Sequence, residues 1–201
     1  MNRISVRQQV VNMLGNISSS LAASVATNLG LEIPQVKESF ITKKSPAVSM
    51  ANTTFSPNTL RIGVIIAHGF DEQKTNQILD QWKRMGLQPV IISEKLGKVR
   101  GANSTEWRVE GSFLTGSPLL YDGLYVVGGD AEGTTFNWKT KSYVVETYNH
   151  YKPIGLTHKG ATIIQPLGII GQPGVLVEEE STPFANDFTK VMTKQRFWVR
   201  G

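Results

Sequence analysis

The sequence predicts an α/β protein: a three-layer sandwich with a mainly parallel sheet, preceded by a helical arm and a linker. The apolar, β-branched run Ile62–Ala67 is too short to span a bilayer and is typical of a strand buried on both faces. Apolar residues at helical spacing follow it, from Ile78 to Met85, and Gln88–Ser93 forms a second apolar strand. Because strand, helix and strand fit within about 35 residues, they predict a βαβ unit with parallel strands.

The segments after this unit extend the same sheet. Three more strands are expected, at Asp122–Asp130, Lys152–His158 and Gly174–Val177, with a turn at Lys159–Gly160. The segment Leu96–Gly111 is expected to form a small hairpin or an excursion of the sheet. A helix is expected over Lys139–Tyr151, and Ser181 is predicted to cap a last helix that buries Phe184 to Met192. Strands that alternate with helices over about 140 residues indicate a doubly wound, flavodoxin-like sandwich.

The chain before Leu60 has a different character. Apolar residues recur at every third or fourth position, at Val10, Leu14, Ile17, Leu21, Val25 and Leu29. This stripe predicts one amphipathic helix from about Arg7 to Leu29, ended by Gly30. The following segment lacks any period and is rich in Ser, Thr, Pro and Lys, as linkers are. We therefore expect a helical arm at residues 1–34, a linker at 35–59 and the α/β domain at 60–201.

Composition excludes several functional classes. The 201 residues include 21 basic and 16 acidic residues, a net charge of +5 that is scattered along the chain, so we expect no nucleic-acid partner. No apolar run is long enough for a membrane span. The absence of cysteine excludes disulfides and thiol catalysis. The N-terminus lacks the apolar region of a secretory signal, which favours a cytoplasmic location, although three possible glycosylation sites, at Asn16, Asn52 and Asn103, leave secretion as the alternative.

Any chemistry should lie beyond the carboxyl ends of the strands, as in other sheets of this kind. The sequence delivers His68–Glu72, Gly128–Asp130 and Thr157–Gly160 to that edge. The pair Gly128–Gly129 could cradle an anion, but no nucleotide-binding glycine pattern is present. His68, His158 and Asp71 could form a metal or acid–base cluster, or could be ordinary loop residues. We expect the acidic run Glu178–Glu180 to interact with the dipole of the helix that follows it.

At these strand ends the sequence resembles the PfpI/DJ-1 class of glutamine-amidotransferase-like domains. The similar segments are Ala67–Glu72, Tyr125–Asp130 and Lys152–Gly160. The resemblance places the catalytic cysteine of that class on His158, its histidine neighbour on Lys159, and its supporting glutamate near Lys74. All three residues are replaced and the chain has no cysteine, so the resemblance implies a domain without thiol chemistry and without a metal or cofactor of its own.

Four further segments resemble the large-subunit haem catalases, which carry a degenerate domain of this class at their C-terminus. They are the arm Leu14–Pro34, the entry Leu60–Val64, the stretch Gly111–Thr115 and the closing Lys194–Trp198. This resemblance implies a parent that disproportionates hydrogen peroxide at haem. It also implies a non-catalytic C-terminal domain that stabilises and shields the assembly, with the catalase core of the same polypeptide and its oligomer as partners.

The haem-binding core itself is not found in the sequence, because no tyrosine has an arginine four residues before it. We therefore expect the detached C-terminal part of a large catalase or a stand-alone relative of it. One alternative is a protein-binding, chaperone-like module that takes unfolded client proteins through the apolar face of the arm. A further alternative is a small-molecule enzyme that uses His158 and Asp71.

Overall fold

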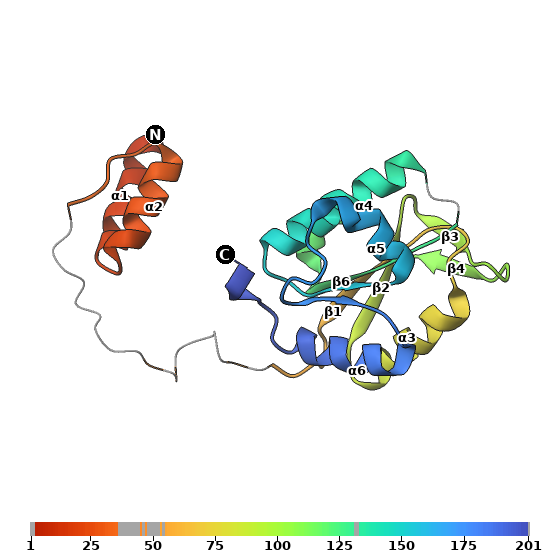
Figure 1. The fold of residues 1–201 in the computed structure, drawn as a ribbon. Coiled ribbons are helices and arrows are strands. Elements are labelled where there is room, and N and C mark those ends of the chain that lie inside the picture. Colours follow the sequence, from red (N-terminus) through yellow and green to blue (C-terminus); the bar gives the residue numbers. More distant parts are fainter. Residues whose placement is uncertain are drawn as a thin grey trace. The chain divides into compact units, whose positions relative to one another are not determined.

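The computed structural model describes residues 3–35, 55–130 and 133–200, together with residues 45, 47 and 53. The chain divides into two compact units, Met1–Ser49 and Met50–Gly201 (Figure 1). Most of the expected linker at 35–59 lies outside the described residues. In the described part of the chain, no helix combines the length and the apolar character that crossing a membrane requires.

The arm is a pair of helices, so the prediction of one helix over residues 7–29 is wrong. Helix α1 spans Arg3–Gly15 and α2 spans Ser19–Leu29. The break lies at Ser18, which is the N-cap of α2. Its backbone is extended, and its side-chain oxygen accepts a hydrogen bond from the amide of Leu21. The predicted end at Gly30 is confirmed: its φ of 62° is left-handed, and its amide donates to the carbonyls of Ala26 and Thr27.

Small side chains, and not the predicted stripe, form the interior of the arm. Val11, Ala22 and Ala26 are fully buried, which lets the two helices lie side by side (Figure 1). Large apolar side chains remain on the outside: Val10, Met13, Leu21 and Leu29 are between 43% and 68% exposed. The arm therefore presents an apolar outer face that its own two helices do not cover.

The second unit is the predicted three-layer sandwich with a parallel sheet. Its strand order is β5-β2-β1-β6-β7-β8 and each neighbouring pair is parallel. The strands are β1 (Arg61–Ile66), β2 (Gln88–Ser93), β5 (Gly111–Ser112), β6 (Gly123–Gly128), β7 (Ile154–Leu156) and β8 (Val175–Val177). The expected hairpin is confirmed as β3 (Gly97–Arg100) and β4 (Glu106–Val109). Short 3₁₀ turns lie at Pro118–Leu120, Gln165–Leu167 and Trp198–Arg200.

Four helices cover the two faces of the sheet (Figure 1). They are α3 (Glu72–Arg84), α4 (Thr134–Asn149), α5 (His158–Ile164) and α6 (Ser181–Met192). Buried residues of α3 and α6, including Trp82 and Phe188, form one core cluster with the sheet. Those of α4 and α5, including Val144 and Ile164, form the other. The two apolar layers explain why the central strands are apolar on both faces.

Three predicted boundaries differ from the structure. Helix α4 begins five residues earlier than expected, which brings Phe136 into the core. The expected turn at Lys159–Gly160 is instead the first turn of α5, capped by Thr157. The residue before α6 is Glu180, so Ser181 lies inside the helix, and its hydroxyl donates to Glu178 and does not cap the helix.

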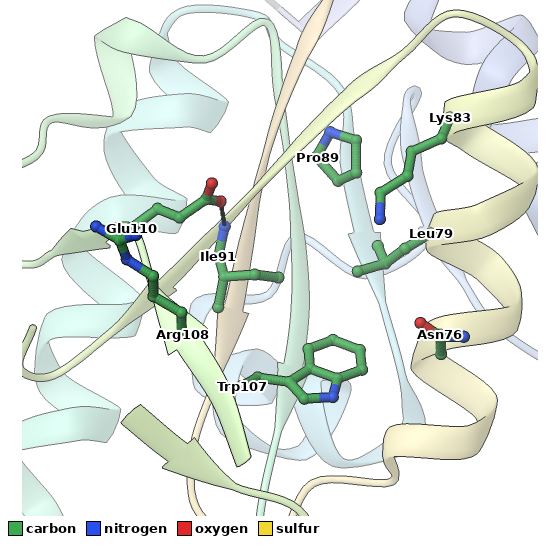
Figure 2. Close-up of a pocket in the computed structure, with 8 residues that line it drawn as sticks. All are labelled: Asn76, Leu79, Lys83, Pro89, Ile91, Trp107, Arg108 and Glu110. Atoms are coloured by element: carbon green, nitrogen blue, oxygen red, sulfur yellow. Dashed lines mark hydrogen bonds between the residues drawn. The ribbon is translucent and has the colours of Figure 1, made fainter. Parts of the chain in front are cut away.

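The outer edge of β2 is closed to further strand pairing (Figure 2). Ile91 donates its amide to the carboxylate of Glu110 at 2.9 Å, and its carbonyl accepts the amide of Glu110. Pro89, the next outward-facing position, has no amide hydrogen to donate. This arrangement protects an edge strand that would otherwise be open to a foreign strand.

The stability of the sandwich should fall in alkaline solution through Tyr143. Its hydroxyl is buried and donates to the carbonyl of Gly116 at 2.7 Å, and burial raises its pKa from 10 to about 12. Since the folded pKa is raised, this stabilisation is complete below pH 10 and is lost as the pH rises towards 12. In chemical denaturation across that range, the loss of stability should be about 2 kcal/mol smaller in Tyr143→Phe than in the unmodified protein, because other buried tyrosines also contribute. An equal pH dependence in both proteins would contradict this assignment.

Candidate functional site

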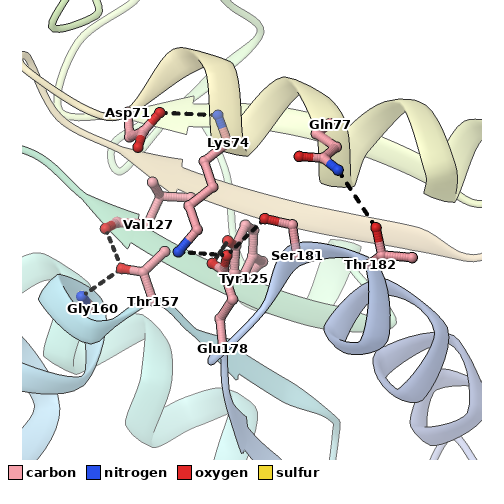
Figure 3. Close-up of polar contacts among 10 residues, drawn as sticks. All are labelled: Asp71, Lys74, Gln77, Tyr125, Val127, Thr157, Gly160, Glu178, Ser181 and Thr182. Atoms are coloured by element: carbon pink, nitrogen blue, oxygen red, sulfur yellow. Dashed lines mark hydrogen bonds and ion pairs between the residues drawn. The ribbon is translucent and has the colours of Figure 1, made fainter.

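The candidate site lies at the carboxyl ends of β1, β6 and β7, where two helices begin. Asp71 caps α3 by accepting the amide of Lys74 at 2.9 Å. Thr157 caps α5 by accepting the amide of Gly160 at 2.9 Å, and its hydroxyl donates to the carbonyl of Val127 at 2.7 Å (Figure 3). The two caps follow β1 and β7, which both neighbour β6, so the two helix starts lie on either side of the end of β6.

A small pocket of about 160 Å³ lies between these helix starts. It is lined by Phe70, Asp71, Lys74, Thr75, Val127, Thr157, His158, Lys159 and Glu178. This pocket brings together the three positions that the resemblance matches to catalytic residues, Lys74, His158 and Lys159, and Asp71 lies there too. We call this junction of strands and helices the elbow. The described residues hold no group of three His, Cys, Asp or Glu side chains suited to a metal ion.

Other predicted residues lie outside this pocket. His68 is exposed, and its Nδ1 accepts the amide of Arg100 at 3.1 Å. The structure shows another role for the Gly128–Gly129 pair, the possible anion cradle. A Cβ atom on Gly129 would lie 2.4 Å from the carbonyl oxygen of His68, and the amide of Asp130 donates to that same oxygen. This glycine therefore allows two loops to touch through their backbones.

The polar centre of the pocket is Glu178, the first residue of the acidic run that precedes α6. Its side chain is 1% exposed and accepts three interactions (Figure 3). The hydroxyl of Tyr125 donates at 2.6 Å, that of Ser181 at 3.2 Å, and the ammonium of Lys74 lies 3.2 Å away. Burial and the adjacent carboxylate together raise the pKa of Tyr125 well above its ordinary value, so this phenol stays protonated.

One signal in the sequence could have identified Glu178. Tyr125 stands in the middle of an otherwise apolar strand, and a buried tyrosine hydroxyl needs a hydrogen-bond partner. The end of a neighbouring strand is the nearest source of one. Lys74 then supplies the charge that a buried carboxylate requires.

The polar side chains at the elbow are engaged or exposed. His158 is exposed at the first position of α5, and Lys159 forms an ion pair with Asp130. The carboxylate of Asp71 is engaged in capping α3, and that of Glu178 is held by three donors. The arrangement is a neutralised, hydrogen-bonded network, whereas nucleophilic catalysis requires a reactive group beside a base.

The elbow also requires a glycine, which provides a test of its geometry. A Cβ atom on Gly160 would lie 2.1 Å from the carbonyl oxygen of Val126, so α5 packs directly on the backbone of β6. Gly160→Ala should lower the free energy of unfolding by about 2–3 kcal/mol, measured by urea denaturation. Gly133→Ala is the control: no atom lies within 4 Å of the added Cβ, and the change should stay below about 1 kcal/mol. Equal effects of the two substitutions would contradict the close packing.

Comparison with known proteins agrees with the catalase resemblance. Residues 58–201 match a family model described as the C-terminal domain found in long catalases. The chain is similar to the catalase of Alkalihalophilus pseudofirmus, with 37% identity over 98% of the chain and 29% of the relative. It is also similar to Catalase-2 of Bacillus subtilis, with 30% identity over 97% of the chain and 29% of the relative.

Catalase HPII of Pseudomonas aeruginosa is 26% identical over 98% of the chain and 29% of its own length. The chain thus spans about three tenths of the length of these curated relatives. In all three, the similarity extends over the arm as well as the sandwich, since it covers nearly the whole chain. The family match confirms the resemblance drawn from the sequence: this chain belongs to the family of C-terminal domains of long catalases.

Proposed function

We propose that this chain is the non-catalytic C-terminal domain of a large catalase, and that it stabilises and shields the assembly. The parent would disproportionate hydrogen peroxide to water and oxygen at a haem held by its core, in the cytoplasm. The observation that carries the proposal is the replacement of the catalytic residues at the elbow. Where a related enzyme would place its thiol, this chain has the exposed His158, and the adjacent Glu178 is neutralised by Lys74. Such a network supports structure and not turnover.

The outer face of the arm supports attachment to a catalase core. Val10, Met13, Leu21 and Leu29 are all large, apolar and exposed within the arm. Burying a side chain of this kind fully contributes roughly 1.5–3 kcal/mol, so the face has a strong drive to be covered. The curated relatives are about three times longer than this chain, which leaves room in such proteins for a core that covers it. We infer that the core of the same polypeptide, or of its oligomer, does so.

The test is an assay of the purified chain, produced in cells supplied with a haem precursor. The chain should show no Soret band and should consume no peroxide above a heat-denatured sample, with a complete catalase as the positive control. Stoichiometric Soret absorbance, or peroxide consumption that scales with the concentration of the chain, would contradict a non-catalytic role.

The stabilising role has a separate test. In a parent catalase that contains this chain, deletion of residues 60–201 should lower the temperature at which half of the peroxide activity is lost. Thermal inactivation at the same temperature with and without the domain would remove the stabilising part of the proposal.

A protein-binding module is the second candidate, and the exposed apolar side chains of the arm are the observation that favours it. If the detached chain captured unfolded proteins, it would suppress the light scattering of a heat-stressed client at an equimolar ratio. Replacement of Val10 and Leu21 by serine should abolish that effect. Unchanged scattering in the presence of the unmodified chain would end this candidate.

A further inference from the structure

A second cavity lies between helix α3 and strands β2 and β4 (Figure 2). This groove has a volume of about 410 Å³, within the range of roughly 300–1,000 Å³ that small-molecule sites occupy. It shares no lining residue with the pocket at the elbow. The positions matched to catalytic residues do not line this groove, and the proposed role in a catalase does not account for it.

The walls of the groove are apolar and already in place. Leu79, from α3, is almost completely buried, and Ile91, from β2, is partly buried in the same cluster. Trp107, from β4, forms the aromatic wall (Figure 2). Its ring packs edge-to-face on Phe70, with 4.8 Å between ring centroids, and Phe70 is fully buried. The indole is therefore held in one orientation, with part of its surface open to the groove.

The groove is lined by two cations, Lys83 and Arg108, and by one carboxylate, Glu110. In Figure 2 the ammonium of Lys83 points into the groove, and the carboxylate that pairs with it, Asp80, is 3.9 Å away. No described residue accepts a hydrogen bond from the guanidinium of Arg108 on the opposite wall. The carboxylate of Glu110 is engaged with the amide of Ile91. A ligand that enters the groove thus meets the ammonium of Lys83 and the aromatic surface of Trp107.

The closed edge of β2 indicates what kind of occupant fits. A bound peptide strand would need the outward amides of β2, but Pro89 has none and Ile91 already bonds Glu110 through both of its backbone groups. The occupant must therefore bind through ring contacts and charge, without a backbone ladder. A small molecule meets that requirement.

We propose that this groove binds a small aromatic carboxylate, with its ring against Trp107 and its carboxylate on Lys83. Ring stacking on the indole supplies the apolar contact, and the ammonium supplies a charge-assisted hydrogen bond. Binding of such a ligand does not depend on the role proposed for the domain in a catalase.

The experiment titrates the full chain with 3-phenylpropionate and follows the indole N–H signals of its four tryptophans by NMR. Trp107→Phe assigns the signal of interest. The Trp107 signal should shift and saturate with a Kd on the order of 1 mM, while the signal of the buried Trp82 stays in place. The uncharged 3-phenylpropanamide and the non-aromatic 3-cyclohexylpropionate should each bind about tenfold more weakly.

Two variants distinguish binding in the groove from non-specific binding of an anion to a basic protein. Lys83→Gln should weaken binding about tenfold. Lys190→Gln should not, although Lys190 is also an exposed helix lysine paired with an aspartate three residues away. The proposal is overturned by a Trp107 signal that does not move up to about 10 mM ligand, or by equal affinity in Lys83→Gln. A Trp107 shift that follows protein concentration alone would also overturn it, because a second copy would then fill the groove.

Discussion

Trp82→Ala should lower the free energy of unfolding of the sandwich by about 3–5 kcal/mol. The indole is fully buried where α3 and α6 meet the sheet, and its Nε1 donates to the carbonyl of Ala185 at 3.1 Å. The ring lies 5.2 Å from the rings of both Tyr125 and Phe188, centroid to centroid. Removing it leaves a cavity between two layers, which destabilises the fold, whereas the carbonyl of Ala185 keeps the hydroxyl of Thr189 as a donor at 2.8 Å.

Urea denaturation followed by far-ultraviolet circular dichroism measures this loss without relying on tryptophan fluorescence. Trp138→Ala is the matched control, because the same side chain is 59% exposed on α4. That substitution should change the free energy of unfolding by about 0.5 kcal/mol or less. Comparable losses in the two proteins would show that Trp82 is not central to the core.

Glu178→Ala should cost about 3 kcal/mol. The substitution leaves the hydroxyl of Tyr125 buried without its acceptor and removes the partner of Lys74. Since Lys74 is 43% exposed, water can solvate its ammonium, so most of the cost comes from the buried phenol. Tyr125→Phe together with Glu178→Ala should then cost less than the sum of the two single substitutions.

Glu179→Ala is the control for this network, since the neighbouring carboxylate is exposed. Its effect should stay within about 0.5 kcal/mol. An additive double substitution, or a loss in Glu178→Ala no larger than in Glu179→Ala, would contradict a coupled network at the elbow.

The sandwich could be predicted from the sequence because its signals are local and agree with one another. The apolar run Ile62–Ala67 and the helical spacing around Trp82 each have one consistent structural interpretation. The prediction for the arm was wrong because two sequence signals there favour different structures. A continuous apolar stripe suggested one helix, but Ser18 offers a cap in its middle, and a cap does not alter the spacing of apolar residues.

The elbow was partly predictable for a related reason. His158, Lys159 and Lys74 were identified through the resemblance, and the structure places all three at one pocket. Glu178 was missed because an acidic run before a helix is a common, exposed pattern, and only burial distinguishes its first member from Glu179. The groove at Trp107 was also missed, because it joins α3 to a hairpin some 25 residues away and no local pattern records that contact.

The central claim is that a catalase core covers the apolar face of the arm. Hydrogen exchange tests this claim most directly. In the monomeric chain, the amides of α1 and α2 should exchange much faster than those of β1 and β6. Helices of 13 and 11 residues are marginal unless an apolar face is buried. In a parent catalase that contains this chain, the same arm amides should be strongly protected. Equal protection of the arm and of β1 in a proven monomer would contradict the claim.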